Sequence, residues 1–262
     1  MTRPWTALGA VAPGDLAEAR LELHYAAWVV AAAGASLLEP RSDDSHPNLG
    51  WDGAARVLAG HGLSRERTLR AALDPHALAL QVRDDTGPLA RLALDGVSLD
   101  ASTEWLGEAL ERAGLEVPRA GLHRPEYALP PHTLASGASF GTADRAAVHE
   151  VAAWIADAAI VLEDVAQQTA DASPVRCWPH HFDIATLLSA PGESGEQARS
   201  VGVGLSPGDG SIPEPYWYVT PWPYPPAETE LPDLPGGGHW NREGFTAAVL
   251  PATALLQVSG AE

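Results

Sequence analysis

Two long stretches of the chain place apolar residues at helical spacing. In residues 14–38 the apolar positions recur every three or four residues, and Asp15 is a suitable N-cap. Pro40 then ends the pattern, because proline cannot continue a helix. Residues 144–168 repeat this arrangement. We therefore predict two long amphipathic helices.

Between these helices the pattern changes to alternation of apolar and polar residues, which is typical of strands. Three short runs, 68–73, 77–83 and 89–94, are separated by turn residues such as Asp, Pro and Gly. This predicts an antiparallel meander over 67–94, packed on the first helix. A further helix is expected at 100–114, with Ser98 or Asp100 as its cap and Gly114 at its end.

The remaining segments are less periodic. Residues 115–141 are rich in proline and predict a connecting segment without regular structure. Strands are expected at 174–189, 199–206 and 215–222, followed by a proline-rich loop to about residue 238. A last strand or short helix is expected at 245–256.

This order predicts an α+β fold, in which antiparallel sheets pack on long helices. One division is a helix-plus-meander half at 1–125 and a second helix-plus-sheet half at 140–262, and the alternative is one continuous domain. The two halves contain similar tetrapeptides, Ala26-Ala27-Trp28-Val29 and Ala152-Ala153-Trp154-Ile155. This similarity raises the hypothesis of a duplicated unit.

Composition narrows the classes of function. The net charge of −18 opposes binding to phosphate backbones, so we expect no nucleic-acid partner. All 16 basic residues are arginine, which excludes a lysine that anchors pyridoxal phosphate (PLP) and the lysine of a P-loop nucleotide site. No apolar run is long enough for a membrane span and no secretory signal begins the chain. With only Cys177, no internal disulfide can form, and a cytoplasmic location is expected.

The densest polar cluster lies at 175–183, on or just before a predicted strand. Within a strand His181 and Asp183 would share one face and His180 and Phe182 the other, unless Pro179 breaks the register. A histidine oriented by a carboxylate is typical of a general base or a metal ligand. The structural alternative is a strand end that carries two partly exposed imidazoles. No spacing matches a known metal-binding motif, so a divalent metal is compatible with this cluster but not implied.

A second candidate feature joins glycines and aromatic residues. Gly202 and Gly204 leave one face of the strand at 199–206 without side chains, so an aromatic ring, a helix or a ligand should lie against that face. The strand at 215–222 supplies aromatic residues, which would line an organic-ligand pocket or pack inside the core. Cys177 is either a nucleophile near His180 or a buried inert thiol. No nucleophile-elbow motif of a serine hydrolase is present.

Several short strings of this chain occur in the same order as in a known pattern. The strings are Leu23-His24, the stretch 48–51, Ser173-Pro174-Val175 with His180 and Phe182-Asp183, Pro207-Gly208-Asp209, Glu214-Pro215, Tyr218 and Val249-Leu250-Pro251. In these strings the chain resembles a bacterial family known only as a domain of unknown function, and the likeness covers most of its length. The family brings no activity, but the resemblance favours His180 over His181 and weakens the case for Cys177.

Our leading hypothesis is a small-molecule enzyme with a histidine and carboxylate site, in which His180 is the acid or base. The rival hypothesis is a non-catalytic ligand-binding or assembly module with an aromatic-lined pocket. We also expect His24 to approach His180 across the interior, because a buried imidazole needs a polar partner. The plain alternative is a bond from His24 to a backbone carbonyl. The candidate catalytic residues are His24, His180, Asp183 and Glu214, and the candidate ligand-binding residues are Asn48, Trp178, Asp209, Tyr218 and Trp240.

Overall fold

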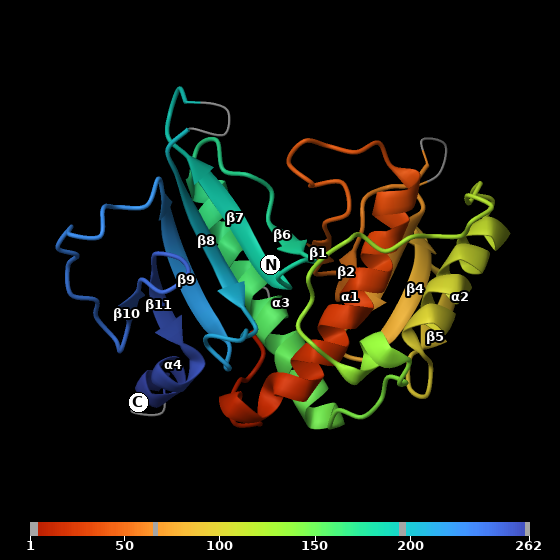
Figure 1. Ribbon diagram of the computed structural model, residues 1–262, viewed down its shortest axis with the longest axis horizontal. Helices are drawn as coiled ribbons and strands as arrows, with labels where there is room; N and C mark the ends of the chain where they lie inside the picture. The colour runs from red at the N-terminus through yellow and green to blue at the C-terminus, as the bar shows by residue number, and fades with distance from the viewer. Residues whose placement is uncertain (1–4, 65–67, 194–197, 260–262) are drawn as a thin grey trace. The chain divides into compact units, whose positions relative to one another are not determined.

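The computed structural model describes residues 5–64, 68–193 and 198–259, and its fold is α+β (Figure 1). Within these residues, two antiparallel sheets of five and six strands are accompanied by four α-helices. The chain divides into two units. The α1 unit comprises Glu18–Ala152 with Cys177–Phe182, and the α4 unit comprises Met1–Ala17, Ala153–Arg176 and Asp183–Glu262.

The first helix forms where the apolar pattern predicts it. A short 3₁₀ turn, η1 (Pro13–Leu16), leads into α1 (Ala17–Leu37). Asp15 is not the N-cap as predicted, because the 3₁₀ turn already starts at Pro13. Ala12 occupies the cap position, and its carbonyl accepts the Asp15 amide at 2.9 Å. No helix among the described residues is long and apolar enough to cross a bilayer.

Helix α1 is buried around most of its circumference, whereas the predicted amphipathic helix would bury only one face. Every side chain from Glu22 to Ala27 is buried, although these positions cover all faces of a helical turn. Gly34 lets the following loop approach closely, since a Cβ there would lie 2.7 Å from the carbonyl oxygen of His46. The polar groups on this helix therefore need partners from distant segments.

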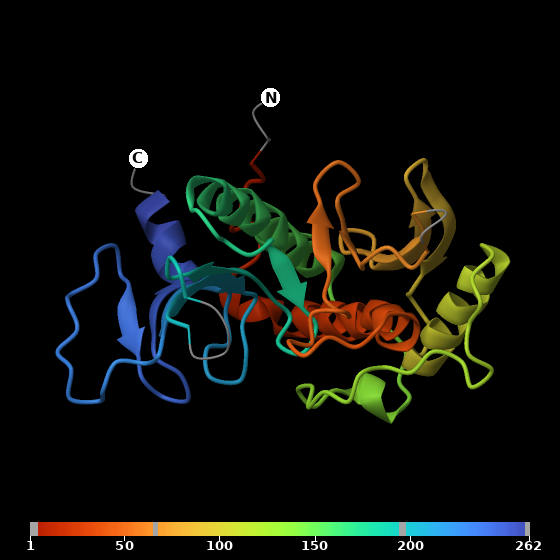
Figure 2. The same cartoon turned by 90° about the horizontal axis from the view of Figure 1, so that it is seen from above.

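The sheet of the α1 unit is a meander of five strands in sequence order. Its strands are β1 (Gly50–Asp52), β2 (Val57–Ala59), β3 (Arg70–Asp74), β4 (Ala79–Asp84) and β5 (Gly87–Ala93). The predicted meander is confirmed for the described residues, and only Arg67 lies outside them. Figures 1 and 2 show α1 along one face of this sheet. Leu80 and Val82 of β4 are fully buried, as the alternation predicts.

Helix α2 (Leu99–Arg112) packs against β4 and β5 and has the predicted ends. The Ser98 side chain accepts the amide of Ala101, and Gly114 adopts a left-handed φ of 95° just past the helix. The next segment is irregular as predicted, apart from the short turn η2 (Thr133–Ser136).

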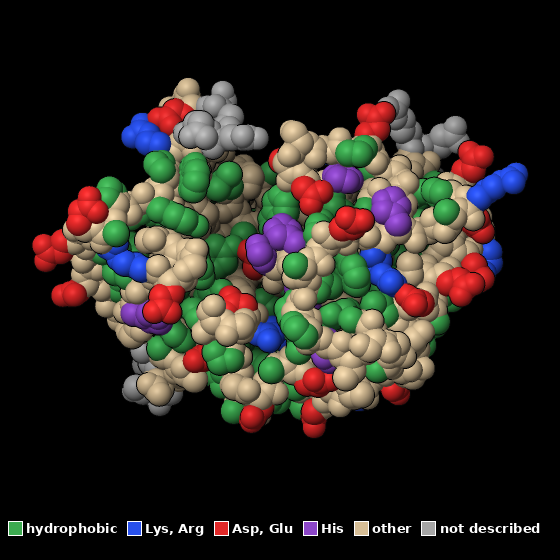
Figure 3. Space-filling model, viewed as in Figure 1, with side chains coloured by type: hydrophobic (Ala, Val, Ile, Leu, Met, Phe, Trp, Pro, Cys, Tyr) green, Lys and Arg blue, Asp and Glu red, His purple; other side chains and the backbone are tan. Residues whose placement is uncertain are grey.

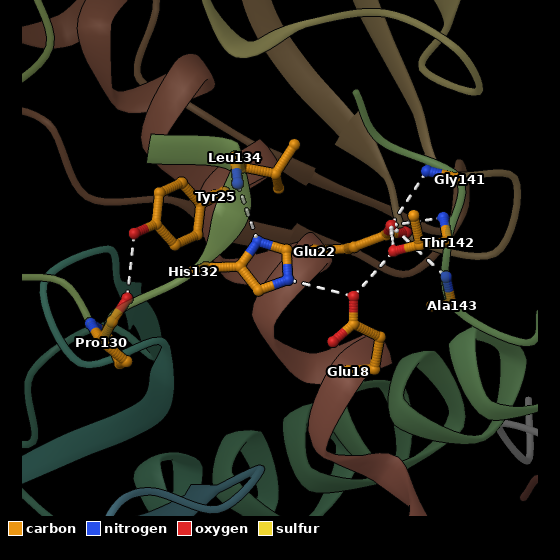
Figure 4. A network of polar contacts seen from close by, with 9 residues as sticks. All are labelled: Glu18, Glu22, Tyr25, Pro130, His132, Leu134, Gly141, Thr142 and Ala143. Atoms are coloured by element: carbon orange, nitrogen blue, oxygen red, sulfur yellow. Dashed lines mark hydrogen bonds and ion pairs between the residues drawn. The ribbon is translucent and has the colours of Figure 1, made fainter. Parts of the chain in front are cut away.

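A buried carboxylate connects α1 to the end of that segment (Figure 4). Glu22 is fully buried, and its Oε1 accepts the amides of Gly141 at 2.9 Å and Thr142 at 2.7 Å. One turn earlier, Glu18 accepts the Thr142 hydroxyl at 2.7 Å and contacts His132 Nε2 at 3.0 Å. Backbone amides and the Thr142 hydroxyl thus supply the hydrogen bonds to the buried Glu22 carboxyl group.

The α4 unit contains the end of the second long helix and most of the second sheet. Helix α3 (Arg145–Gln168) is confirmed, and its part from Ala153 belongs to this unit. Figures 1 and 2 show α3 along one face of the long strands. The sheet order is β10-β11-β9-β8-β7-β6. The strands are β6 (Arg176–Trp178), β7 (Asp183–Ser189), β8 (Ser200–Ser206), β9 (Tyr216–Trp222), β10 (His239–Asn241) and β11 (Ala247–Pro251).

Three details of this unit differ from the prediction. The expected strand at 174–189 is two strands, because a turn at residues 179–182 interrupts it. The short strand β10 was not predicted, and it lies between the predicted loop to about residue 238 and the predicted element at 245–256. The segment at 245–256, predicted as a strand or a short helix, contains both, since β11 runs directly into α4 (Ala252–Ser259).

The glycine face of β8 is covered by an aromatic ring, as predicted. Gly204 lies opposite Tyr218 of β9, and a Cβ on Gly204 would lie 2.5 Å from Tyr218 Cζ. The Tyr218 hydroxyl donates to Asp183 at the start of β7, so the tyrosine crosses β8 above the glycine. The absent side chain therefore allows a bond between two strands that are not neighbours in the sheet.

Replacing Gly204 with valine should lower the free energy of unfolding by about 1–3 kcal/mol, because the new side chain overpacks against the Tyr218 ring. Tyr218 cannot simply rotate away without losing its bond to Asp183. Urea titration measures the change, and Gly210→Val is the control, since nothing lies within 4 Å of a Cβ at Gly210. Equal stability of the two variants would contradict the packing described here.

Candidate functional site

The turn between β6 and β7 brings two histidines together. The carbonyl of Trp178 accepts the amides of His181 at 3.1 Å and Phe182 at 2.7 Å, and Phe182 has a left-handed φ of 60°. The rings of His180 and His181 lie 4.3 Å apart between centroids. The chain therefore follows the alternative in which the strand register breaks at Pro179, and the two imidazoles do not alternate across one strand. A strand cannot continue through a chain that turns after Pro179.

This turn is anchored to the α1 unit by backbone pairing. The amide of Leu49 donates to the Cys177 carbonyl at 3.0 Å, and the amide of Cys177 donates to the Leu49 carbonyl at 2.8 Å. Cys177 is only 1% exposed. A thiol with so little access to solvent fits the inert alternative rather than a nucleophile.

His24 meets the turn from α1. Its side chain is 3% exposed, and Nε2 donates to the carbonyl of Pro179 at 2.8 Å. Its ring stacks on Phe182, with centroids 5.3 Å apart. The structure thus shows the plain alternative, in which His24 bonds a backbone carbonyl, that of the residue before His180.

Burial lowers the pKa of His24 from 6.5 to about 4, and the bond to Pro179 opposes this shift only in part. The charges of Arg20, His181 and His180 lower the pKa further. His24 is therefore neutral at pH 7, with its proton on Nε2, where Pro179 accepts it. His24 therefore supports the turn, and its Nε2 is not available to bond a substrate.

His180 lies against three rings. Its centroid is 5.5 Å from Tyr127, 5.9 Å from Trp178 and 4.3 Å from His181. We call these four residues the histidine cluster. His180 is partly buried and His181 is exposed, and Figure 3 shows several histidine side chains at the surface of the face it draws.

Burial and a neighbouring charge keep the His180 imidazole neutral at pH 7. Burial, and then the charge of His181, lower the pKa of His180 to about 4, while Asp44 opposes the shift. The Tyr127 hydroxyl donates to Asp44 at 3.0 Å, and burial together with this carboxylate raises the Tyr127 pKa. At pH 7 the cluster thus offers a neutral imidazole beside a tyrosine and a carboxylate.

Asn48 serves a structural role in the α1 unit. It is 2% exposed, and its Oδ1 contacts His61 Nε2 at 2.9 Å. The same His61 nitrogen contacts the carbonyl of Ser45 at 3.0 Å. Because both partners are acceptors, Nε2 carries the proton. Asn48 therefore fixes the loop before β1.

The three candidate carboxylates belong to the α4 unit, and each has an internal partner. Asp183 accepts the hydroxyl of Tyr218, and Asp209 accepts the Tyr216 hydroxyl at 2.5 Å as well as the amide of Ile212 at 2.8 Å. Glu214 accepts the amide of Thr253 at 2.7 Å and so caps the first turn of α4. These carboxylates hold strands, a loop and a helix end.

Trp240, the remaining candidate, donates from Nε1 to the carbonyl of Pro232 at 2.8 Å in the α4 unit. Of the predicted residues, the structure thus brings together His24, Trp178 and His180. Tyr127, which belongs to the histidine cluster, and Asp44, which bonds Tyr127, were not predicted. An aromatic residue in an otherwise irregular, proline-rich segment was the only signal for Tyr127.

Within residues 5–64, 68–193 and 198–259, no group of three or more His, Cys, Asp or Glu side chains is arranged to hold a metal ion. No family model, curated protein or solved structure matches this chain. The resemblance to a family of unknown function therefore stays a prediction.

The pKa of His24 gives a pH dependence of stability. Its pKa is about 4 in the folded chain against 6.5 as the ordinary value. The unfolded chain therefore binds more protons between these values, and the free energy of unfolding should fall as the pH drops from 6.5 to 4. His24→Gln should reduce this fall between pH 6.5 and 5, measured by urea titration at several pH values. His239→Gln, at an exposed histidine, is the control, and identical pH profiles of both variants would contradict the prediction.

Proposed function

We propose that the protein binds a small aromatic or heteroaromatic molecule at the histidine cluster. The observation that carries this proposal is the state of His180. Its imidazole contacts three rings, yet it makes no hydrogen bond to any residue that the structure describes. An imidazole without a hydrogen-bond partner in the described protein can bond a ligand that supplies a donor or an acceptor.

The chemistry of the cluster suits a flat, uncharged ligand. Aromatic pairs contribute about 0.5–1.5 kcal/mol beyond the area they bury, and Tyr127, Trp178 and His181 all present rings. The neutral imidazole of His180 supplies one donor and one acceptor nitrogen. A heteroaromatic molecule with both kinds of group would match it.

The second candidate function is proton transfer on such a molecule, with His180 as the base. It is favoured by the neutral state of this imidazole, which can accept a proton at pH 7. Two features place it second. A pKa of about 4 is far from the value at which a general base works best near neutral pH, and the candidate carboxylate orienters bond to partners in the α4 unit.

Binding is tested by calorimetric titration of the intact chain with adenine, nicotinamide and indole. At least one compound should bind, and Trp178→Ala and His180→Ala should each weaken its binding about tenfold or more. Each substitution removes either a stacking surface or the central imidazole of the cluster. Trp240→Ala and His239→Ala are matched controls in the α4 unit and should bind as the unaltered chain does. Circular dichroism checks that all variants are folded.

Three outcomes are informative. If no compound of the panel binds, or if the cluster variants bind as well as the controls, the proposal fails. If a bound compound also exchanges a proton, the exchange rate should rise between pH 3 and 5 and then stay level, following a His180 pKa of about 4. Exchange that survives in His180→Ala would exclude His180 as the base.

A further inference from the structure

A small pocket elsewhere in the α1 unit gathers basic groups in a chain that is otherwise strongly acidic. Its volume is about 170 Å³, which is roughly six times the ~30 Å³ that a water molecule occupies in the liquid. His76 and Arg145 line it together with the apolar side chains of Leu78 and Val148. One carboxylate, Asp95, also lines the pocket.

Arg145 differs from most arginines of this protein. Arg145 makes no hydrogen bond or ion pair with any residue that the structure describes. Arg56, which contacts His76, forms no ion pair with a carboxylate among these residues. In a chain with 34 acidic residues and 16 arginines, carboxylates are plentiful, so an unpaired arginine is the exception. The arginines with carboxylate partners include Arg70, Arg83, Arg91, Arg112, Arg124 and Arg199.

His76 presents a second unused donor. Its Nε2 lies 2.9 Å from a guanidinium nitrogen of Arg56. Because arginine can only donate, Nε2 is the acceptor, and the proton of the neutral ring lies on Nδ1. No described residue accepts from Nδ1. The neighbouring ring of His149, 6.1 Å away between centroids, makes only an edge contact.

We propose that this pocket binds a small carboxylate, held by the Arg145 guanidinium and the Nδ1–H of His76. A guanidinium matches a carboxylate with two parallel donors. Asp95 favours a singly charged anion over a doubly charged phosphate, because it adds a negative charge to the same pocket. Leu78 and Val148 favour a ligand with a short aliphatic chain.

The fixed position of Asp95 supports this preference. Its Oδ1 lies so close to Gly141 that a Cβ on that glycine would be 2.0 Å away. Gly141 has a left-handed φ of 99° and its amide is bonded to the buried Glu22. The loop that carries the glycine is thus held in place, and Asp95 rests against it beside the ligand.

The experiment is an NMR titration of histidine-labelled protein at pH 7 with butyrate, inorganic phosphate and sodium chloride. Butyrate should move the His76 ring signals along a saturable curve, and phosphate should require at least tenfold higher concentrations. The His76 signals are assigned from their loss in His76→Asn. Bound anion should also raise the His76 pKa, which burial and the charges of Arg56 and His149 lower in the free protein while Asp74 opposes the shift.

Arg145→Gln should weaken butyrate binding at least tenfold, and it should fold normally because Arg145 is exposed at the first turn of α3. Arg119→Gln, which removes the same charge from another exposed position, should leave binding unchanged. The proposal is overturned if butyrate produces no saturable shift, if both arginine variants behave alike, or if phosphate binds as tightly as butyrate.

Discussion

Three side chains of helix α1 donate hydrogen bonds to the carbonyls of prolines far along the chain. His24 binds Pro179, Tyr25 binds Pro130 and Trp28 binds Pro125, at distances of 2.8 to 2.9 Å. Burying such donors without partners would cost about 1–3 kcal/mol each, so the helix can be buried only if these segments reach it. A proline has no amide hydrogen, yet its carbonyl remains a full acceptor. Proline-rich segments that cannot join a sheet thereby become the partners of a buried helix.

The histidine cluster depends on the same constraint. The bond from His24 holds Pro179, and the turn after Pro179 places His180 against Trp178 and His181. The bonds from Tyr25 and Trp28 hold the proline-rich segment that carries Tyr127. Two segments that are about 50 residues apart in sequence therefore supply rings to one cluster because a single helix fixes both.

Local patterns predicted the three longer helices and most of the longer strands. Helical spacing located α1 and α3, alternation located β3 to β5, and the missing side chain of Gly204 predicted the aromatic ring that lies on it. Each of these depends on residues close in sequence or on one neighbouring strand. The Asp15 cap failed because a 3₁₀ turn precedes α1, and the strand through Pro179 failed because a turn was read as extended chain.

The candidate site was harder to predict because residue type does not reveal which partner satisfies a polar group. Asp183, Asp209 and Glu214 have the chemistry of catalytic carboxylates. In the structure Asp183 bonds a tyrosine hydroxyl, Asp209 bonds loop amides and Glu214 bonds the first turn of a helix. Tyr127 and Asp44 join the cluster through long-range contacts that no periodic pattern records. The partner of His24 could be anticipated, because a buried imidazole needs a polar group to bond.

Hydrogen exchange at the turn tests most directly whether α1 holds the histidine cluster. The amides of His181 and Phe182 are bonded to the Trp178 carbonyl, and their protection reports whether the turn stays closed. In His24→Phe the ring can still stack on Phe182, but the donor to Pro179 is lost. Our account predicts that these two amides exchange at least tenfold faster in the variant, while the strand amides of β8 keep their protection. Unchanged exchange at His181 and Phe182 would contradict it.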